Sequence, residues 1–408
     1  MKCGLLGRKL GHSYSPQIHG MLGTYDYTLF EKEPEELEAF LRFGDFTGIN
    51  VTIPYKKDVI PFLDELSPVA RRLGAVNTVV RRTDGSLYGH NTDYFGFRSL
   101  VLRTGIAVSG KKALVLGSGG ASNTAVAVLQ ELGAQVIVVS RSGKNNYSNL
   151  DLHKDAAILV NATPLGMYPA TGVAAVEVED FPALECVLDV IYNPAKTKLL
   201  LDAQHLSIPC ANGLWMLVAQ AKEAAECFTG SPISDDVMEP IYQHLSRQMQ
   251  NIILIGMPGC GKSTIAALLA QKTGRIALDS DDLVCRLAGK TIPEIFSRES
   301  EEAFRTLETR ALGELCKQSA RIVSTGGGCV TRPENLPLLR QNGKVIWLKR
   351  DLEMLPTDGR PLSQANRLTD LYARREPLYA AFSDTSIDNN GSPEETVAAI
   401  IRYWEESE

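Results

Sequence analysis

The segment Gly256-Met-Pro-Gly-Cys-Gly-Lys-Ser263 fits the pattern G-x-x-x-x-G-K-[ST]. Its glycines let backbone N–H groups turn toward phosphate oxygens, and the positive end of the following helix points at the same oxygens. In this pattern the lysine reaches the β- and γ-phosphates and the final hydroxyl serves Mg²⁺. An apolar strand precedes the loop and an Ala- and Leu-rich helix follows it, which makes a plain glycine turn the weaker interpretation. The pattern predicts ATP binding by Gly256, Gly259, Gly261, Lys262, Ser263 and Thr264.

Charged residues after this loop are spaced to form a pocket beside ATP. ALDSDDLV puts Asp279 and Asp281 two positions apart after a short strand, so that one can face a metal ion and the other a substrate. In TGGG, at 325–328, bare amides can approach a ligand closely. Arginine forks suit a carboxylate, so we expect a small anionic alcohol as the acceptor. The arginines concerned are Arg305, Arg360 and Arg375.

A second glycine-rich turn, Gly117-Ser-Gly-Gly-Ala-Ser122, approximates a dinucleotide-binding fingerprint, with Ser122 in place of the last Gly or Ala. ALVL precedes it, an Ala-rich helix follows, and the strand VIVVS comes next. An NAD-binding protein would place an acid at the end of that strand. Here Ser140 and Arg141 occupy the position, and a guanidinium with hydroxyls fits a 2′-phosphate. NADP is therefore favoured over NAD; an ordinary surface arginine is the alternative.

These groups must be positioned by a chain of 408 residues, long enough for two or three domains. Short apolar runs alternate with helical patterns, which predicts an α/β fold. We expect an α/β substrate domain at 1–104, a Rossmann-like domain at 105–212, closing helices at 213–245 that pack back on the first domain, and a P-loop kinase domain with a parallel sheet at 250–408.

Composition narrows the class of protein further. Hydrophobic residues make up 44%, charged residues 22%, and the net charge is −6, so neither nucleic acid nor a membrane is expected as a partner. The start of the chain lacks a signal-peptide pattern. Eight cysteines without Cys-x-x-Cys spacing favour reduced thiols in a cytoplasmic protein. Whether the chain forms a homo-oligomer is left open.

In their order, the motifs from Asn251 onward resemble the shikimate kinase family. The resemblance implies that Ser263 and Asp279 serve Mg²⁺, and that Lys262 and Arg360 neutralise the transferring phosphoryl group, Arg360 with a lid that is shorter than usual in the family. Asp281 would hold and deprotonate the acceptor hydroxyl. The implied substrate-binding residues are Asp281, Arg305, Gly327, Gly328 and Arg375.

In the first half, GHSYSPQIH, INVTIPYKK, AVNTV and GHNTDYFGF resemble the shikimate dehydrogenase family, and the match extends to about Leu245. Hydride arriving at a ketone leaves negative charge on oxygen, where Lys56 would donate a proton, with Asp93 keeping the amine charged. Substrate binding is implied for Ser13, Ser15, Thr52, Asn77, Tyr192 and Gln220. Contacts with NADP(H) are implied for Gly117, Gly119, Gly120, Ala121, Ser140, Arg141, Asn161, Thr163 and Met216.

Both resemblances together imply two consecutive steps on small molecules: NADPH-dependent reduction of 3-dehydroshikimate to shikimate, then phosphorylation of shikimate by MgATP to shikimate 3-phosphate. Two alternatives are kept. One is a quinate-type dehydrogenase fused to another small-metabolite kinase, against which Arg305, Arg375 and Asp281 argue. The other is a nucleotide-sensing regulator with one inactive half, which the presence of Lys56 and Lys262 disfavours.

Overall fold

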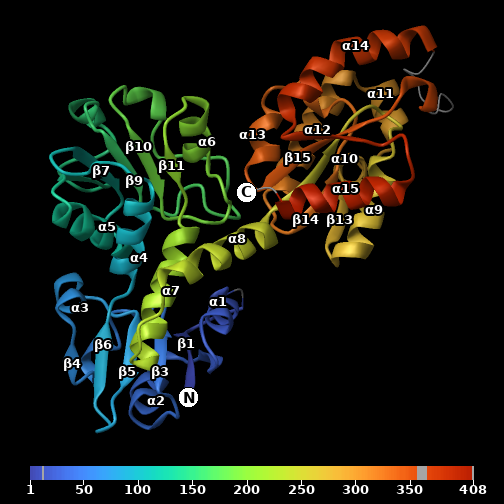
Figure 1. The fold of residues 1–408 in the computed structure, drawn as a ribbon. Helices are drawn as coiled ribbons and strands as arrows, with labels where there is room; N and C mark the ends of the chain where they lie inside the picture. The colour runs from blue at the N-terminus through green and yellow to red at the C-terminus, as the bar shows by residue number, and fades with distance from the viewer. Residues whose placement is uncertain (12, 356–364, 407–408) are drawn as a thin grey trace. The chain divides into compact units, whose positions relative to one another are not determined.

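In the computed structural model the chain forms two compact units, and residues 1–11, 13–355 and 365–406 are described (Figure 1). Each unit is made of three segments, and the segments of the two units alternate along the chain. Unit 1 consists of Met1–Leu165, Ala174–Tyr192 and Asp202–His244, and unit 2 of Gly166–Val173, Asn193–Leu201 and Leu245–Glu408.

A mixed sheet in the order β2-β1-β3-β5-β6-β4 forms the N-terminal part of unit 1. The strands are β1 (Lys2–Gly7), β2 (Asp26–Glu31), β3 (Gly48–Val51), β4 (Glu65–Leu66), β5 (Thr78–Arg81) and β6 (Leu87–His90). Three helices accompany them: α1 (Ser15–Leu22), α2 (Leu37–Phe43) and α3 (Pro68–Leu73). Leu41, Ile49 and Val79 are fully buried in its core, so the alternating apolar positions of these strands hold the helices against the sheet.

The second sheet of unit 1 is parallel throughout, in the order β11-β10-β9-β7-β8. Its strands are β7 (Lys112–Leu116), β8 (Gln135–Val139), β9 (Ile158–Asn161), β10 (Cys186–Asp189) and β11 (Cys210–Ala211), with the helix α5 (Gly120–Glu131). The helix α6 (Lys198–His205) begins in a segment of unit 2 and ends in unit 1. β9 and β10 are buried along their whole length, as expected for parallel strands covered on both faces.

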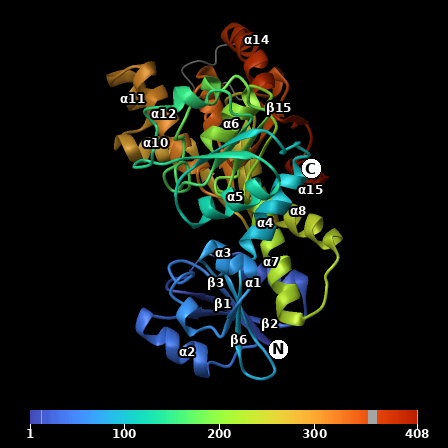
Figure 2. The same cartoon turned by 90° about the vertical axis from the view of Figure 1, so that its left-hand side faces the viewer.

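Helices α4 (Asp93–Arg103) and α7 (Leu214–Thr229) run side by side in unit 1. Their backbones meet at Gly96, where an added Cβ would lie 2.6 Å from the carbonyl oxygen of Met216. The C-terminal half of α7 packs on the first sheet, since a Cβ at Gly48 would lie 2.2 Å from the ring of Phe228. Figure 2 shows α2 and α7 on opposite sides of that sheet. α8 (Met238–Met249) follows.

Unit 2 is built around a parallel sheet in the order β13-β14-β12-β15-β16. The strands are β12 (Asn251–Ile255), β13 (Ile276–Asp279), β14 (Arg321–Ser324), β15 (Gly343–Lys349) and β16 (Thr385–Asp388). The helices are α9 (Lys262–Thr273), α10 (Ser280–Ala288), α11 (Ile292–Arg298), α12 (Glu301–Cys316), α13 (Asn335–Arg340), α14 (Ala365–Phe382) and α15 (Pro393–Glu406). The carboxyl ends of β12, β13 and β14 share one edge, where ligands bind in open α/β sheets.

These sheets confirm the predicted fold class. An N-terminal α/β part is followed in the sequence by two α/β parts with parallel sheets. Each of the eight cysteines is a free thiol. Within the described ranges, every helix is too short or too polar to cross a lipid bilayer.

Candidate active sites

The glycines of the phosphate loop adopt backbone conformations that other residues rarely reach. Gly256 has φ of 147° and Gly261 has φ of 94°, and a Cβ at Gly256 would lie 2.6 Å from the carbonyl oxygen of Leu348. The Lys262 ammonium is buried and donates to the carbonyl oxygens of Gly256, at 3.0 Å, and Met257, at 2.9 Å. The lysine side chain therefore folds back over the loop. Phosphate oxygens of a bound nucleotide could take the place of these carbonyl oxygens as acceptors.

Ser263 and Asp279 lie together at the start of α9 and the end of β13. Ser263 Oγ donates to Asp279 Oδ2 at 2.8 Å. The other oxygen of Asp279 accepts from the backbone N–H of Asp281 at 2.9 Å, which caps α10 and fixes the carboxylate. A serine hydroxyl and a carboxylate are hard oxygen ligands of the kind that Mg²⁺ takes, so these two residues fit the predicted metal role.

Asp281 is the most perturbed acid of this site. Its Oδ1 is buried and has no hydrogen-bond partner among the described residues. Burial raises the pKa of Asp281 to about 6, and the neighbouring carboxylates of Asp279 and Glu308 add to the shift. A carboxyl with this pKa is partly available as a proton acceptor near neutral pH, which is what a base facing a substrate hydroxyl requires.

Arg305 is held in place by two carboxylates of its own helix, α12. Its guanidinium donates to Glu308 Oε2 at 2.7 Å and to Glu301 Oε1 at 3.2 Å. A Cβ at Gly328 would lie 2.2–2.4 Å from the atoms of that guanidinium, and one at Gly326 would lie 2.3 Å from Glu308 Oε1. The glycine run is therefore needed so that the ion pair can lie directly against the backbone.

Arg375, from α14, reaches the same glycine run from the other side. Its guanidinium donates to the carbonyl oxygen of Gly327 at 3.1 Å, and the buried Tyr379 hydroxyl donates to the same oxygen. A Cβ at Gly327 would lie 2.6 Å from Pro258 of the phosphate loop. Close contact therefore joins the phosphate loop, the glycine run and the second arginine.

A cavity of about 660 Å³ connects these groups. The predicted residues among its lining are Gly259, Gly261, Lys262, Ser263, Thr264, Asp279, Asp281, Arg305, Gly327, Gly328 and Arg375. Sequence reasoning missed Tyr379. The spacing in FRTLE placed Glu308 one helical turn after Arg305, and the structure pairs the two side chains at 2.7 Å. Arg360 lies outside the described residues.

In unit 1, Lys56 and Asp93 form the predicted pair. Lys56 Nζ donates to Asp93 Oδ2 at 2.6 Å, with 31% and 20% of the two side chains exposed. Lys56 follows β3, and Asp93 opens α4. Partial exposure leaves the amine accessible from solvent while the carboxylate holds it, an arrangement suited to donating a proton to a bound molecule.

Beside this pair, three side chains form a hydrogen-bonded network. Asn77 Oδ1 accepts from the backbone N–H of Thr92 at 2.7 Å, and Asn77 Nδ2 donates to Thr92 Oγ1 at 3.1 Å. Thr92 Oγ1 also reaches Gln220 Oε1 at 3.4 Å. Thr92, buried and directly before Asp93, was not predicted from the sequence. It links the predicted Asn77 and Gln220 to the start of α4.

The remaining predicted substrate residues, Ser13, Ser15, Thr52 and Tyr192, are half-buried. Ser13 Oγ accepts from the backbone N–H of Ser15 at 3.2 Å, at the start of α1. Tyr14 and Tyr192 meet edge to face, with ring centroids 6.3 Å apart. Thr52 comes directly after β3. The pair of aromatic rings thus connects the start of α1 with the segment that follows β10.

The glycine turn after β7 is shaped for a ligand. Gly117 has φ of 111° and lies against the backbone of Ala162, 2.8 Å from an added Cβ. Cβ atoms at Gly119 and Gly120 would meet nothing within 4 Å. Open space at the N-terminal end of α5, where Ala121 also lies, is what a pyrophosphate needs.

The other predicted cofactor residues differ in how firmly they are held. Asn161 is buried, donates to Asp189 at 3.0 Å and accepts from Thr163 Oγ1 at 2.7 Å. This network fixes the loop after β9, a structural link that the sequence did not reveal. Ser140 and Arg141 follow β8, with Arg141 exposed, and Met216 is half-buried in the first turn of α7.

Together, the fold and these sites define a class: a dinucleotide-dependent oxidoreductase fold joined to a P-loop phosphotransferase fold. Residues 5–79 match the family model of the shikimate dehydrogenase substrate binding domain, and residues 258–405 match that of shikimate kinase. The chain belongs to the shikimate dehydrogenase family, with a shikimate kinase domain after it. The predicted fusion and its two enzyme classes are thereby confirmed.

Relatives and solved structures agree on the first part of the chain. A shikimate dehydrogenase (NADP(+)) of Clostridium perfringens is 36% identical over 265 residues, which are 59% of this chain and 97% of the relative. Shikimate dehydrogenase 1 of Peptoclostridium difficile is 37% identical with a TM-score of 0.54, covering 60% of this chain and 97% of that one. A quinate dehydrogenase of Corynebacterium glutamicum in complex with NAD has the same TM-score, 0.54, at 29% identity, and the match covers 59% and 98% of the two chains.

Proposed function

We propose that unit 1 reduces 3-dehydroshikimate to shikimate with NADPH, which supplies the hydride. Lys56 donates the proton to the oxygen of the ketone as the carbon is reduced, and Asp93 orients the ammonium. The observation that carries the proposal is the 2.6 Å pair of Lys56 and Asp93 beside the network of Asn77, Thr92 and Gln220. Amide and hydroxyl groups in that network suit ring hydroxyls of a substrate.

The remaining assignments in unit 1 extend this proposal. Ser13, Ser15 and Tyr192 bind the substrate carboxylate, and Thr52 binds a ring hydroxyl. The open turn at Gly119 and Gly120 receives the pyrophosphate, with Gly117 and Ala121 completing the turn. Arg141 and Ser140 receive the 2′-phosphate, while Asn161, Thr163 and Met216 line the nicotinamide side.

Unit 2 phosphorylates the hydroxyl of shikimate, with ATP supplying the phosphoryl group. Asp281 accepts the proton of the attacking hydroxyl, and its raised pKa of about 6 supports this role. Arg305 and Arg375 bind the carboxylate of the substrate, since both line the same cavity as Asp281. Ser263 and Asp279 hold Mg²⁺, and Lys262 neutralises charge on the phosphates.

One coupled assay tests both halves together. The full chain is incubated with 3-dehydroshikimate, NADPH, Mg²⁺ and ATP, and shikimate 3-phosphate is measured by mass spectrometry. Omitting NADPH should leave no product, and omitting ATP should stop the reaction at shikimate. Oxidation of NADPH without any phosphorylated product would refute the proposal for unit 2.

Quinate is the competing substrate to exclude, because a quinate dehydrogenase shares the fold of unit 1. In the oxidising direction, shikimate with NADP⁺ should give a higher kcat/KM than quinate with either NADP⁺ or NAD⁺. A preference for quinate with NAD⁺ would replace the proposed substrate and cofactor.

A further inference from the structure

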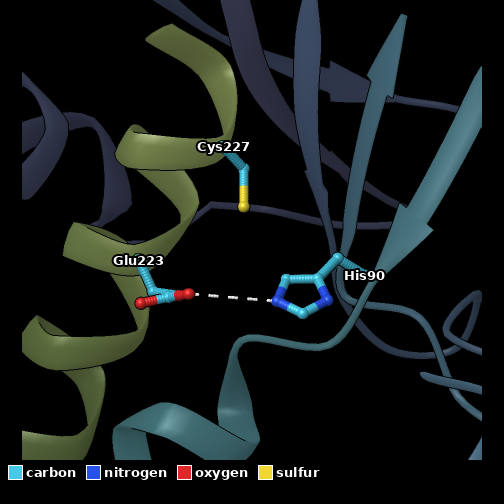
Figure 3. Close-up of side chains that lie close together, drawn as sticks. All are labelled: His90, Glu223 and Cys227. Atoms are coloured by element: carbon cyan, nitrogen blue, oxygen red, sulfur yellow. Dashed lines mark ion pairs between the residues drawn. The ribbon is translucent and has the colours of Figure 1, made fainter. Parts of the chain in front are cut away.

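Three side chains of different chemistry converge between β6 and α7, apart from the groups assigned to either reaction. His90 ends β6, while Glu223 and Cys227 stand one turn apart on α7 and point toward the imidazole (Figure 3). One ligand atom from each residue, an imidazole nitrogen, a carboxylate oxygen and a sulfur, lies within 4.8 Å of the others. All three residues are half-buried.

This spacing is close to that of a metal centre. With bonds of about 2.0–2.3 Å, ligand atoms around a tetrahedral Zn²⁺ are roughly 3.3–3.8 Å apart. The observed separations therefore need to shrink by about 1 Å, which side-chain rotation can supply. The i, i+4 spacing of Glu223 and Cys227 places both on the same face of α7.

The polar atoms of this cluster are poorly satisfied by the protein itself. His90 Nδ1 is buried and has no hydrogen-bond partner in the part of the chain that the structure describes. His90 Nε2 is 4.0 Å from Glu223 Oε1, too far for a hydrogen bond. The ring is held by aromatic neighbours, with centroids 5.4 Å from Phe95 and 6.3 Å from Tyr88.

Among the described residues, the cation whose charge acts on Glu223 is Lys222, and it has other acidic partners. Lys222 is paired with Glu226 at 3.0 Å and with Asp235 at 2.8 Å. Burial, together with the charge of Glu226, raises the pKa of Glu223, and burial lowers the pKa of His90. A divalent cation would supply the positive charge that this carboxylate lacks, and it would bind the neutral form of the imidazole.

We propose that His90, Glu223 and Cys227 form a binding site for Zn²⁺, with water as the fourth ligand. Nitrogen, sulfur and oxygen ligands together favour Zn²⁺ over Mg²⁺ or Ca²⁺. On binding, the S–H bond of Cys227 breaks, its proton goes to solvent, and a Zn–S bond forms. No change of oxidation state is involved.

The site would tie α7 to the start of α4. Gln220 lies one turn before Glu223 on α7, and Thr92 lies two residues after His90. Because Gln220 and Thr92 are in contact at 3.4 Å, bound Zn²⁺ stabilises the same part of unit 1. At a hundredfold excess over Kd, the unfolding transition of this unit should rise by about 5–10 °C.

Binding should depend on pH in a defined direction. Cys227 binds Zn²⁺ only as a thiolate, so its thiol must lose a proton on binding. Each proton released on binding makes Zn²⁺ affinity rise about tenfold per pH unit. Calorimetric titrations in buffers of different ionisation enthalpy count the released protons.

The test titrates the metal-free full chain with Zn²⁺ in excess Mg²⁺, which keeps hard-cation sites filled. We expect one Zn²⁺ per chain with Kd of about 1 µM or tighter, and a thiolate-to-metal charge-transfer band when Co²⁺ is used instead. Cys227→Ser should weaken binding at least about a hundredfold and abolish the band. Cys285→Ser, which removes a half-buried thiol of α10, is the matched control.

Absence of stoichiometric Zn²⁺ binding, or equal affinity in Cys227→Ser and the unmodified chain, would overturn the proposal. Dehydrogenase turnover in the presence of a chelator verifies that each variant is folded. If Cys227→Ser fails to fold, Glu223→Gln carries the same test, since 26% of that side chain is exposed and the substitution keeps its size.

Discussion

At the scale of single residues, the proposed reduction depends on the amine of Lys56. We predict that Lys56→Met lowers ketone reduction by about 10²–10⁴-fold, because a positioned general acid is lost. Kinase turnover should be unchanged. Lys57→Met, at the exposed neighbouring position, controls for loss of charge. Steady-state assays of both reactions give the answer, and a Lys56→Met enzyme of near-normal reductase rate would exclude Lys56 from the mechanism.

In the proposed function, Arg141 decides between the two nicotinamide cofactors by binding the 2′-phosphate of NADPH. Its side chain is exposed, so substitution should affect binding rather than folding. We predict that Arg141→Asp raises the KM for NADPH by tenfold or more, the loss of about 1.5–3 kcal/mol from a charge-assisted contact, and improves relative use of NADH. An unmodified enzyme that already prefers NADH would contradict this assignment.

If Asp281 is the proposed base, kinase activity and stability should change with pH in opposite directions. Its pKa is about 6 in the fold against 3.8 for the ordinary side chain, so between these values the folded state binds more protons than the unfolded state. Stability therefore falls as pH rises through this window, while the active base form increases. We predict that kinase kcat/KM rises to a plateau above about pH 6.

The variant Asp281→Asn separates these two effects. It should abolish most phosphorylation. At pH 8, denaturant unfolding should show that its free energy of unfolding exceeds that of the unmodified protein by at most about 2–3 kcal/mol. At pH 4.5 this difference in the free energy of unfolding should be smaller by about 2 kcal/mol. A gap independent of pH would show that the raised pKa does not cause it.

At the scale of elements, the glycine run after β14 is defined by what lies against it. A methyl group at Gly328 would displace the guanidinium of Arg305 from its pair with the fully buried Glu308, so some loss of stability, up to about 3–5 kcal/mol, should accompany the kinetic effect. We predict that Gly328→Ala raises the KM for shikimate at least about tenfold and leaves that for ATP within twofold.

Gly313→Ala is the matched control for that experiment. Gly313 lies inside α12, and an added Cβ would meet only Leu338, at 4.0 Å. Alanine should stabilise the helix by about 0.5–1 kcal/mol without changing either KM. Equal kinetic effects of both substitutions would mean that Gly328 acts through general stability.

The sequence predicted a residue's place in a site when that residue belongs to a short motif. It did not do so when the residue's contacts lie far away along the chain. Lys262, Ser263 and Asp279 were predicted because their spacing along the chain sets their roles. Thr92 and Tyr379 were missed because their contacts, with Gln220 and Gly327, join segments 128 and 52 residues apart. Single-sequence patterns carry no information on such pairings.

At the scale of the whole molecule, the boundary between the catalytic parts lies inside a helix. α8 ends at Met249, yet the last and longest segment of unit 2 begins at Leu245. Its last turn is bound within that unit: Arg275 donates to the carbonyl oxygen of Arg247 at 2.8 Å, and Arg247 donates to that of Glu405 at 2.7 Å. A cut just before β12 would remove these partners.

We therefore predict that residues 245–408 fold alone as an active kinase and melt at a higher temperature than residues 251–408. Residues 1–244 should retain reduction of 3-dehydroshikimate. Calorimetry and separate assays of each fragment measure this. A fragment that melts cooperatively but is inactive until the other is added would show that the two activities are not independent.

Helix α7 carries Met216, Gln220, Glu223 and Cys227 at intervals of four, three and four residues, so all four lie along one stripe of the helix. Each residue of a helix turns the chain by about 100°. Deleting one residue between Leu214 and Met216 would rotate the entire stripe away from α4 and β6, whereas conservative replacements on the opposite face would leave it in place. In a library of random variants, this helix should therefore accept almost no insertions or deletions.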